Sequence, residues 1–129
     1  MKNCFQVGDV KTYIKKVEIE DIASFDSGTV HQVYATFALG RDAEWSSRLF
    51  VIEMKDEDEE GIGTFLNIQH VSPAKVGDTV VFTAQIDELF KHVIHCKIMA
   101  KVGERIIATG STGQKIIKKE KLEFLFNSL

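Results

Sequence analysis

Thr36, Glu44 and His70 are the residues of this chain whose chemical types and spacing best suit catalysis. A hydroxyl, a carboxylate and an imidazole together supply a nucleophile and a group that moves protons. His70 is the natural general base and acid, because an unperturbed imidazole has a pKa of about 6.5, close to working pH. The residues leave open whether Glu44 attacks the substrate or activates water, and whether Thr36 hydrogen-bonds within this group or is itself the nucleophile.

Each of the three residues also has a plainer explanation when it is taken alone. His70 ends an apolar run and is typical of a hydrogen-bonded strand histidine, whereas Glu44 suits a helix N-terminus through the helix dipole. Thr36 is an ordinary β-branched strand residue. Taken alone, none of the three residues indicates catalysis, and Gly63 and Thr64 open the strand that carries His70.

The pattern of apolar residues predicts one long helix and six strands. Residues 41–55 contain no proline or glycine and place apolar side chains at helical spacing, which indicates the helix. Period-two alternation indicates the strands, and they are predicted at residues 10–22, 31–39, 64–71, 79–87, 93–102 and 105–117. The turn formers of residues 24–29 and the acidic run of residues 56–63 predict loops.

The order of these elements predicts an α+β fold in a single domain of residues 1–129. A chain of 129 residues is long enough for one core and short for two. The last four strands have no crossover helices between them, so the sheet must be antiparallel. A sheet wrapped around the one central helix buries both, and a homodimer or a dimer of dimers, formed through the sheet edges, is expected.

Composition and charge argue against several other classes of protein. A formal net charge of -3 disfavours nucleic-acid binding. The N-terminus lacks the apolar region of a secretory signal and no stretch is long enough to span a bilayer, so a cytoplasmic location without a membrane partner is expected. Cys4 and Cys96 form no CxxC pair and are expected to be free thiols. His92 and His95 lie in a predicted strand, where an offset of three residues sends them to opposite faces, so no metal site is predicted.

Two segments carry a resemblance to a known family. VYATFALGRDAEW (residues 33–45) and GTFLNIQHVSPAKVGDTV (residues 63–80) resemble the fluoroacetyl-CoA thioesterase type of hotdog-fold protein. In that family a threonine before the helix, a glutamate within it and a histidine on the following strand form the active site. The resemblance implies an acyl-CoA substrate and no metal or redox cofactor. It also implies catalytic roles for Thr36, Glu44 and His70 and substrate contacts from Gly63, Thr64 and Lys115.

The resemblance weakens at GSTGQKII (residues 110–117), where the family usually carries a Gly-Thr-His-Glu-Arg run. Here the histidine is lost, and Lys115 replaces the arginine without being able to form its bidentate fork. Two alternatives to a thioesterase therefore remain. One is a noncatalytic hotdog protein that binds an acyl-CoA or another small ligand, and the other is a dehydratase that acts on a hydroxyacyl thioester.

Overall fold

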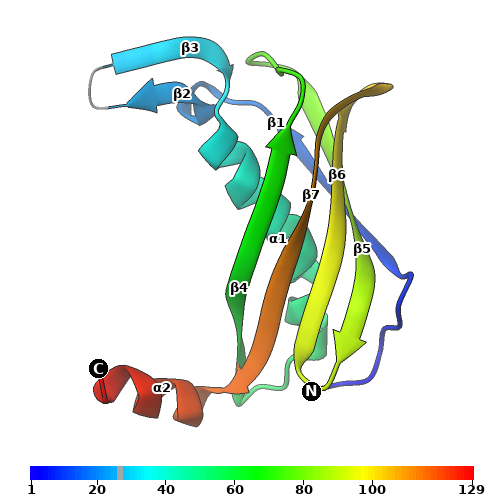
Figure 1. Cartoon of the computed structure of the whole chain (residues 1–129), viewed down its shortest axis with the longest axis vertical. Helices are drawn as coiled ribbons and strands as arrows, with labels where there is room; N and C mark the ends of the chain where they lie inside the picture. Colours follow the sequence, from blue (N-terminus) through cyan, green and yellow to red (C-terminus); the bar gives the residue numbers. More distant parts are fainter. Residues whose placement is uncertain (26–27) are drawn as a thin grey trace.

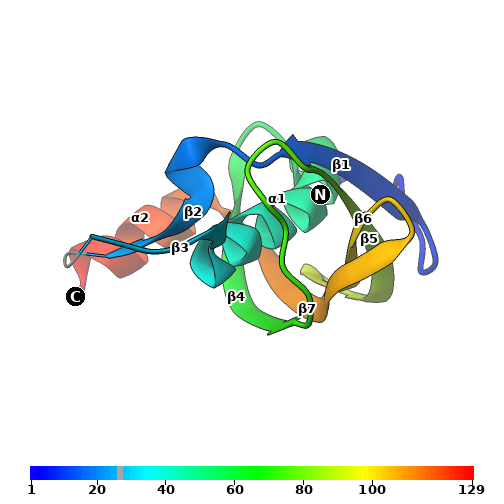
Figure 2. The same ribbon diagram turned by 90° about the horizontal axis from the view of Figure 1, so that it is seen from above.

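The computed structural model describes residues 1–25 and 28–129, and these form an antiparallel sheet that curls around one long helix (Figures 1 and 2). The main sheet has the strand order β1-β5-β6-β7-β4. A separate two-stranded sheet pairs β2 with β3. The elements are β1 (Val10–Lys16), β2 (Ile22–Phe25), β3 (Gly28–Tyr34), α1 (Thr36–Met54), β4 (Glu59–His70), β5 (Thr79–Phe90), β6 (Val93–Val102), β7 (Arg105–Lys118) and α2 (Lys119–Asn127).

Helix α1 packs closely against the inner face of the sheet because five of the residues that it buries before Phe50 are small. These are Ala38, Gly40, Ala43, Ser46 and Ser47. Larger side chains, Phe50 and Met54, fill the space near the helix C-terminus. The strands contribute alternate residues, and burying each large aliphatic or aromatic side chain contributes about 1.5–3 kcal/mol. The alternation predicted for β6 is confirmed, since its buried residues are Ile94, Cys96, Ile98 and Ala100.

The predicted start of the helix was wrong by five residues. Helix α1 begins at Thr36 instead of Arg41, and the short strand predicted for residues 31–39 ends at Tyr34. Thr36 is therefore the first residue of the helix rather than a strand residue. Glu44 lies in the third turn, so the preference of acidic groups for a helix N-terminus does not explain it.

A network of charged side chains fixes the junction between β3 and α1. The buried hydroxyl of Tyr34 donates to Asp42, and Arg41 donates to Asp42 over 3.0 Å and to Asp21 over 2.9 Å. Lys15 of β1 also pairs with Asp21 over 3.1 Å. Asp21 and Asp42 are both buried, and buried carboxylates are stable only when they are paired. The network therefore ties β1, β3 and the start of α1 together.

Four other predictions of local structure differ from the fold. The predicted loop of residues 56–63 is wrong from Glu59 onward, because this buried residue accepts a hydrogen bond from the N–H of Asp56 over 2.8 Å and begins β4. The strand predicted for residues 10–22 ends at Lys16, before a 3₁₀ turn at Ile19–Asp21. The loop predicted for residues 24–29 is wrong at residues 24–25, which belong to β2, and at residues 28–29, which belong to β3. Residues 26–27 lie outside the described residues. Helix α2 was not predicted.

The predictions for the cysteines are confirmed. Cys4 is an exposed free thiol and Cys96 a buried one. Burial raises the pKa of the Cys96 thiol to about 12, so this group is an unreactive part of the core. In the described part of the chain, the helices lack the combination of length and hydropathy that crossing a bilayer requires.

Candidate active site

Thr36 and His70 meet at one end of the main sheet. Thr36 is the first residue of α1 and His70 is the last residue of β4. The Oγ1 atom of Thr36 lies 2.9 Å from Nδ1 of His70, within hydrogen-bond distance. A hydroxyl paired with an imidazole is the arrangement of an activated nucleophile and its base, and the same contact fixes the orientation of the ring.

The surroundings of His70 favour the neutral imidazole. Burial lowers its pKa from the ordinary value, and the nearby backbone of Ser72 opposes this effect only in part. The Nε2 atom is buried and has no hydrogen-bond partner among the residues that the structure describes. Since Nδ1 is engaged with Thr36, Nε2 is the nitrogen left to exchange a proton with a substrate.

Glu44 and Gly63 meet farther along the same helix and strand. The Glu44 carboxylate packs directly on the Cα of Gly63, where a Cβ atom would overlap Oε1. Together with Thr64, Phe65 and Leu66, they line a hollow of about 270 Å³. A β-bulge between Gly63 and Phe65 interrupts the pairing with β7. Bulges leave backbone groups unpaired, and an N–H group next to this carboxylate is a candidate oxyanion donor.

The two pairs are separate within one chain. Eight residues along α1 place Glu44 about 12 Å from Thr36, and seven residues along β4 place His70 about 23 Å from Gly63. The hollow beside His70 and the hollow beside Glu44 have no lining residue in common. Among the described residues, no hydrogen bond or ion pair joins the pairs. The chain therefore contains two separate groups of candidate residues, which we call half-sites. One half-site consists of Thr36 and His70, and the other consists of Glu44, Gly63 and Thr64.

The segment that departs from the resembled family has a structural explanation. Lys115 is exposed on β7, opposite Ile62 of β4. The ring of Phe65 covers Gly113 so closely that a Cβ atom there would overlap it. Phe65 also packs edge-on against His95, with 5.0 Å between ring centroids. The Phe65 ring thus occupies the space in which the family's histidine side chain would begin.

Gln114 is a candidate site residue that the sequence analysis did not assign. Its buried amide lies on β7 opposite Gly63. Its Nε2 donates to Ser47 Oγ over 2.9 Å and to the carbonyl oxygen of Glu44 over 3.3 Å. The Ser47 hydroxyl donates to the same carbonyl oxygen over 2.8 Å. Gln114 thereby holds the helical turn that carries Glu44. The only sequence feature that could have indicated this role is the position of Gln114 just before the apolar residues at the end of β7.

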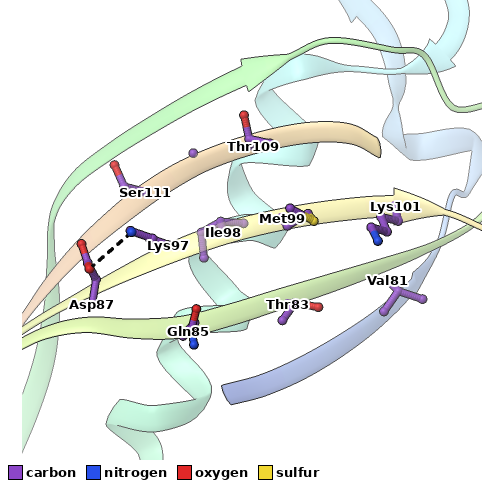
Figure 3. A pocket seen from close by; sticks show the side chains of 11 residues that line it. Val81, Thr83, Gln85, Asp87, Lys97, Ile98, Met99, Lys101, Thr109 and Ser111 are labelled. Atoms are coloured by element: carbon purple, nitrogen blue, oxygen red, sulfur yellow. Dashed lines mark ion pairs between the residues drawn. The ribbon is translucent and has the colours of Figure 1, made fainter. Parts of the chain in front are cut away.

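A larger hollow than those beside His70 and Glu44 lies elsewhere, on the outer face of the main sheet (Figure 3). It has a volume of about 680 Å³ and is lined by side chains of β5, β6 and β7, among them Met99 and Thr109. Lys97 pairs with Asp87 over 3.7 Å at one side of it. None of the three candidate catalytic residues lines this hollow.

An antiparallel sheet wrapped around one long helix is the architecture of a hotdog-fold protein. The family model of FlK, the fluoroacetyl-CoA-specific thioesterase, matches residues 17–120. The chain belongs to that family, which confirms the resemblance drawn from residues 33–45 and 63–80.

Solved structures confirm the predicted hotdog fold. A hypothetical protein from Thermus thermophilus, a thioesterase superfamily member, is 27% identical with a TM-score of 0.92, covering 98% of this chain and 93% of that chain. The fluoroacetyl-CoA thioesterase FlK is 19% identical with a TM-score of 0.89, covering 98% of each chain. A hot-dog-like protein from Thermanaerovibrio acidaminovorans is 20% identical with a TM-score of 0.87, covering 96% of this chain and 92% of that chain. No sequence among the curated proteins matches.

Proposed function

We propose that the protein is an acyl-CoA thioesterase, which hydrolyses a small acyl-CoA to the free acid and coenzyme A with Thr36, Glu44 and His70 as its reacting residues. The proposal rests chiefly on the 2.9 Å contact between Thr36 Oγ1 and His70 Nδ1 in a chain of a thioesterase family. The enzyme needs no metal or redox cofactor, and coenzyme A is part of its substrate. It works in the cytoplasm as a single domain of residues 1–129 and assembles as a homodimer or a dimer of dimers.

The open edge of β4 supports this assembly. β4 is the last strand of the main sheet, and its exposed residues include Phe65 and Leu66. An unpaired strand edge with apolar side chains is a template for another strand, and identical copies most often pair about a two-fold axis. Antiparallel pairing about an axis near the middle of residues 63–70 sets Gly63 of one copy opposite His70 of the other.

This pairing would unite the two half-sites on one thioester. Glu44 of one copy attacks the acyl carbon or holds the attacking water, and backbone N–H groups at the Gly63–Thr64 bulge stabilise the oxyanion. His70 of the other copy donates Nδ1–H to Thr36. If Glu44 holds the water, Nε2 takes the proton from that water as it attacks and delivers it to the thiolate sulfur as the carbon–sulfur bond breaks. If Glu44 attacks, coenzyme A leaves as the thiolate when the acyl–Glu44 anhydride forms, and Nε2 then takes a proton from the water that hydrolyses the anhydride and passes it to the thiolate. The products are one acid and one thiol.

Thiol release from a panel of short and aromatic acyl-CoA esters tests the activity. We expect at least one ester to be hydrolysed, with the free acid and free coenzyme A appearing in equal amounts by mass spectrometry. Loss of water with the thioester intact would instead indicate the dehydratase. Absence of thiol release across the panel would contradict the proposal.

A mixture of two inactive variants tests whether the active site is shared between copies. Glu44→Gln and His70→Ala are each inactive under the proposal, but a mixed dimer contains one site with both residues intact. Random exchange of subunits should therefore restore about a quarter of the wild-type activity. No recovery in dimers shown to be mixed would mean that each chain builds its own site.

Gly63→Ala is expected to lower kcat/KM by about 100-fold, because the added methyl group overlaps the Glu44 carboxylate and displacement by about 1 Å is enough for such a loss. The melting temperature should change little, since Gly63 is exposed. Glu44→Asp provides the control, because the shorter side chain leaves room for the methyl group. In the double variant the two losses should therefore not multiply, and fully multiplicative losses would contradict the steric explanation.

Gln114→Leu is expected to lower kcat about tenfold with little change in KM, because the turn that carries Glu44 loses one or two hydrogen bonds of about 1 kcal/mol each. Gln114→Glu gives a sharper test. A buried carboxyl has a raised pKa and donates a hydrogen bond only when protonated. Its activity should therefore approach wild type at low pH and fall as pH rises through that pKa. A pH profile with the wild-type shape would contradict the positioning role.

A second function is favoured by one observation, the Phe65 ring that covers Gly113. This departure from the family, with the exposed Lys115 on the same strand, suits a hotdog protein that holds an acyl-CoA without turnover. Calorimetry with coenzyme A and an acyl-CoA separates the two functions. Tight binding without thiol release would support the binding protein and contradict the enzyme.

A further inference from the structure

Helix α2 presents apolar side chains that its own chain leaves uncovered. None of its residues is buried. Leu125 is 44% exposed and Phe126 is 61% exposed, and both lie on the face of Leu122, three or four residues apart. An isolated helix of nine residues is unstable in water, so this apolar stripe of Leu122, Leu125 and Phe126 must gain stability from packing.

The position of α2 indicates what it packs against. Lys118, the last residue of β7, pairs with Glu59, so α2 starts at the Glu59 end of β4. From there it runs past the open edge of β4 and away from the core (Figure 1). The β2–β3 hairpin projects on the same side (Figures 1 and 2), but at the His70 end, where Val33 forms a bridge with Lys75.

We propose that α2 docks on the β2–β3 hairpin of a second copy of this chain and thereby holds that hairpin beside the active site. The inference rests on the β4-paired dimer of the proposed function. A two-fold axis through β4 exchanges its two ends, so α2 at the Glu59 end of one copy lies against the hairpin at the His70 end of the other. Stable interfaces bury about 1,200–2,000 Å². Contact between α2 and the hairpin would add buried area to the narrow contact that two paired β4 edges make.

This docking has a direct consequence for the site. Strand β3 ends at Tyr34, two residues before Thr36, so whatever holds the hairpin also steadies the start of α1. Each site would then contain the hairpin, Thr36 and His70 of one copy together with Glu44, Gly63 and α2 of the other. Helix α2 is a positioning element in this scheme and does not touch the reacting atoms.

The variant Leu125→Ser/Phe126→Ser tests the docking, because it removes two of the three side chains of the apolar stripe without disturbing a buried residue. Lys121→Ser is the control, since it lowers helix propensity and leaves the stripe intact. We expect amide hydrogen exchange in residues 28–34 to become at least tenfold faster in the double variant and to stay unchanged in the control. Equal protection in all three proteins would overturn the proposal, since a hairpin held by its own chain does not sense α2.

Mixed dimers determine which copy α2 serves. When the double variant is paired with His70→Ala, the site that retains His70 receives intact Glu44 and intact α2 from the other chain, so activity should recover. When it is paired with Glu44→Gln, the site that retains both catalytic residues receives the altered α2, so activity should stay low. Recovery with Glu44→Gln and not with His70→Ala would show that α2 acts on its own chain, which overturns the proposal.

The failure of the docking and the failure of the shared site give different results. If Glu44→Gln and His70→Ala restore each other, the shared site stands and the pattern with the α2 variant alone decides the docking. If these two variants do not restore each other, the shared site fails, and hydrogen exchange of residues 28–34 in the α2 variant still reports on the docking independently of activity.

Discussion

Glu44→Gln is expected to lower kcat/KM for acyl-CoA hydrolysis by about 1,000-fold or more. The amide has nearly the same shape as the carboxylate, but it does not attack an acyl carbon, and it lacks the negative charge that holds and polarises the attacking water. Among the described residues, the Glu44 carboxylate has no hydrogen-bond or ion-pair partner whose loss would weaken the fold. The melting temperature should therefore stay within about 2 °C of wild type.

Steady-state thiol release and thermal unfolding of the same preparations measure the two effects. Glu57→Gln is the matched control, because it makes the same chemical change at an exposed position just after α1. It should leave both quantities unchanged. A Glu44→Gln protein that keeps more than about a tenth of the wild-type activity would remove Glu44 from the chemistry, because the loss expected for a nucleophile or for the group that holds the attacking water is about 1,000-fold.

His70→Ala is expected to lower kcat/KM by about 100-fold to 10,000-fold, the usual contribution of a general base and acid. The pH dependence follows from the same group. Burial lowers the pKa of His70, so the imidazole is neutral and active as a base above a pKa that lies below about 6.5. Wild-type activity should therefore be constant near pH 7 and fall as pH decreases through this pKa.

The residual activity of His70→Ala should lack this acid limb.

Thr36→Val and Thr36→Ser separate the role of the Thr36 hydroxyl from that of the His70 ring. The serine variant keeps the contact with Nδ1 and should retain most of the activity, whereas the valine variant leaves His70 without it and should lose about tenfold or more. An acid limb that persists unchanged in His70→Ala would show that another group titrates.

The sequence pattern predicted the sheet and the helix that it covers, because the local alternation of polar and apolar residues shows which face of each element is buried. The alternation of Ile94, Cys96 and Ile98 depends only on one face of β6 meeting the core. The start of α1 could not be predicted in this way, because the segment around Thr36 suits a strand and a first helical turn equally well. In the structure, side-chain contacts that no periodicity reveals hold this junction, among them the hydrogen bond from the Tyr34 hydroxyl to Asp42.

The candidate site was predicted in its residue types and not in its grouping. Spacing suggested one cluster of Thr36, Glu44 and His70, whereas the rise of α1 separates the first two by about 12 Å and creates two half-sites. The role of Gln114 depends on the register that sets it opposite Gly63. Helix α2 was missed because it is short and residues 121–124 alternate polar and apolar side chains much as a strand would.

A crystal structure with a nonhydrolysable acyl-CoA analogue tests the central claim most directly. The account predicts that the atom replacing the sulfur, or the carbonyl carbon beside it, lies between Glu44 of one copy and His70 of a second copy, with the carbonyl oxygen at the Gly63–Thr64 bulge. An analogue bound instead in the hollow on the outer face of the sheet (Figure 3), lined by Met99 and Thr109, with Glu44 and His70 both remote from its acyl group, would contradict it.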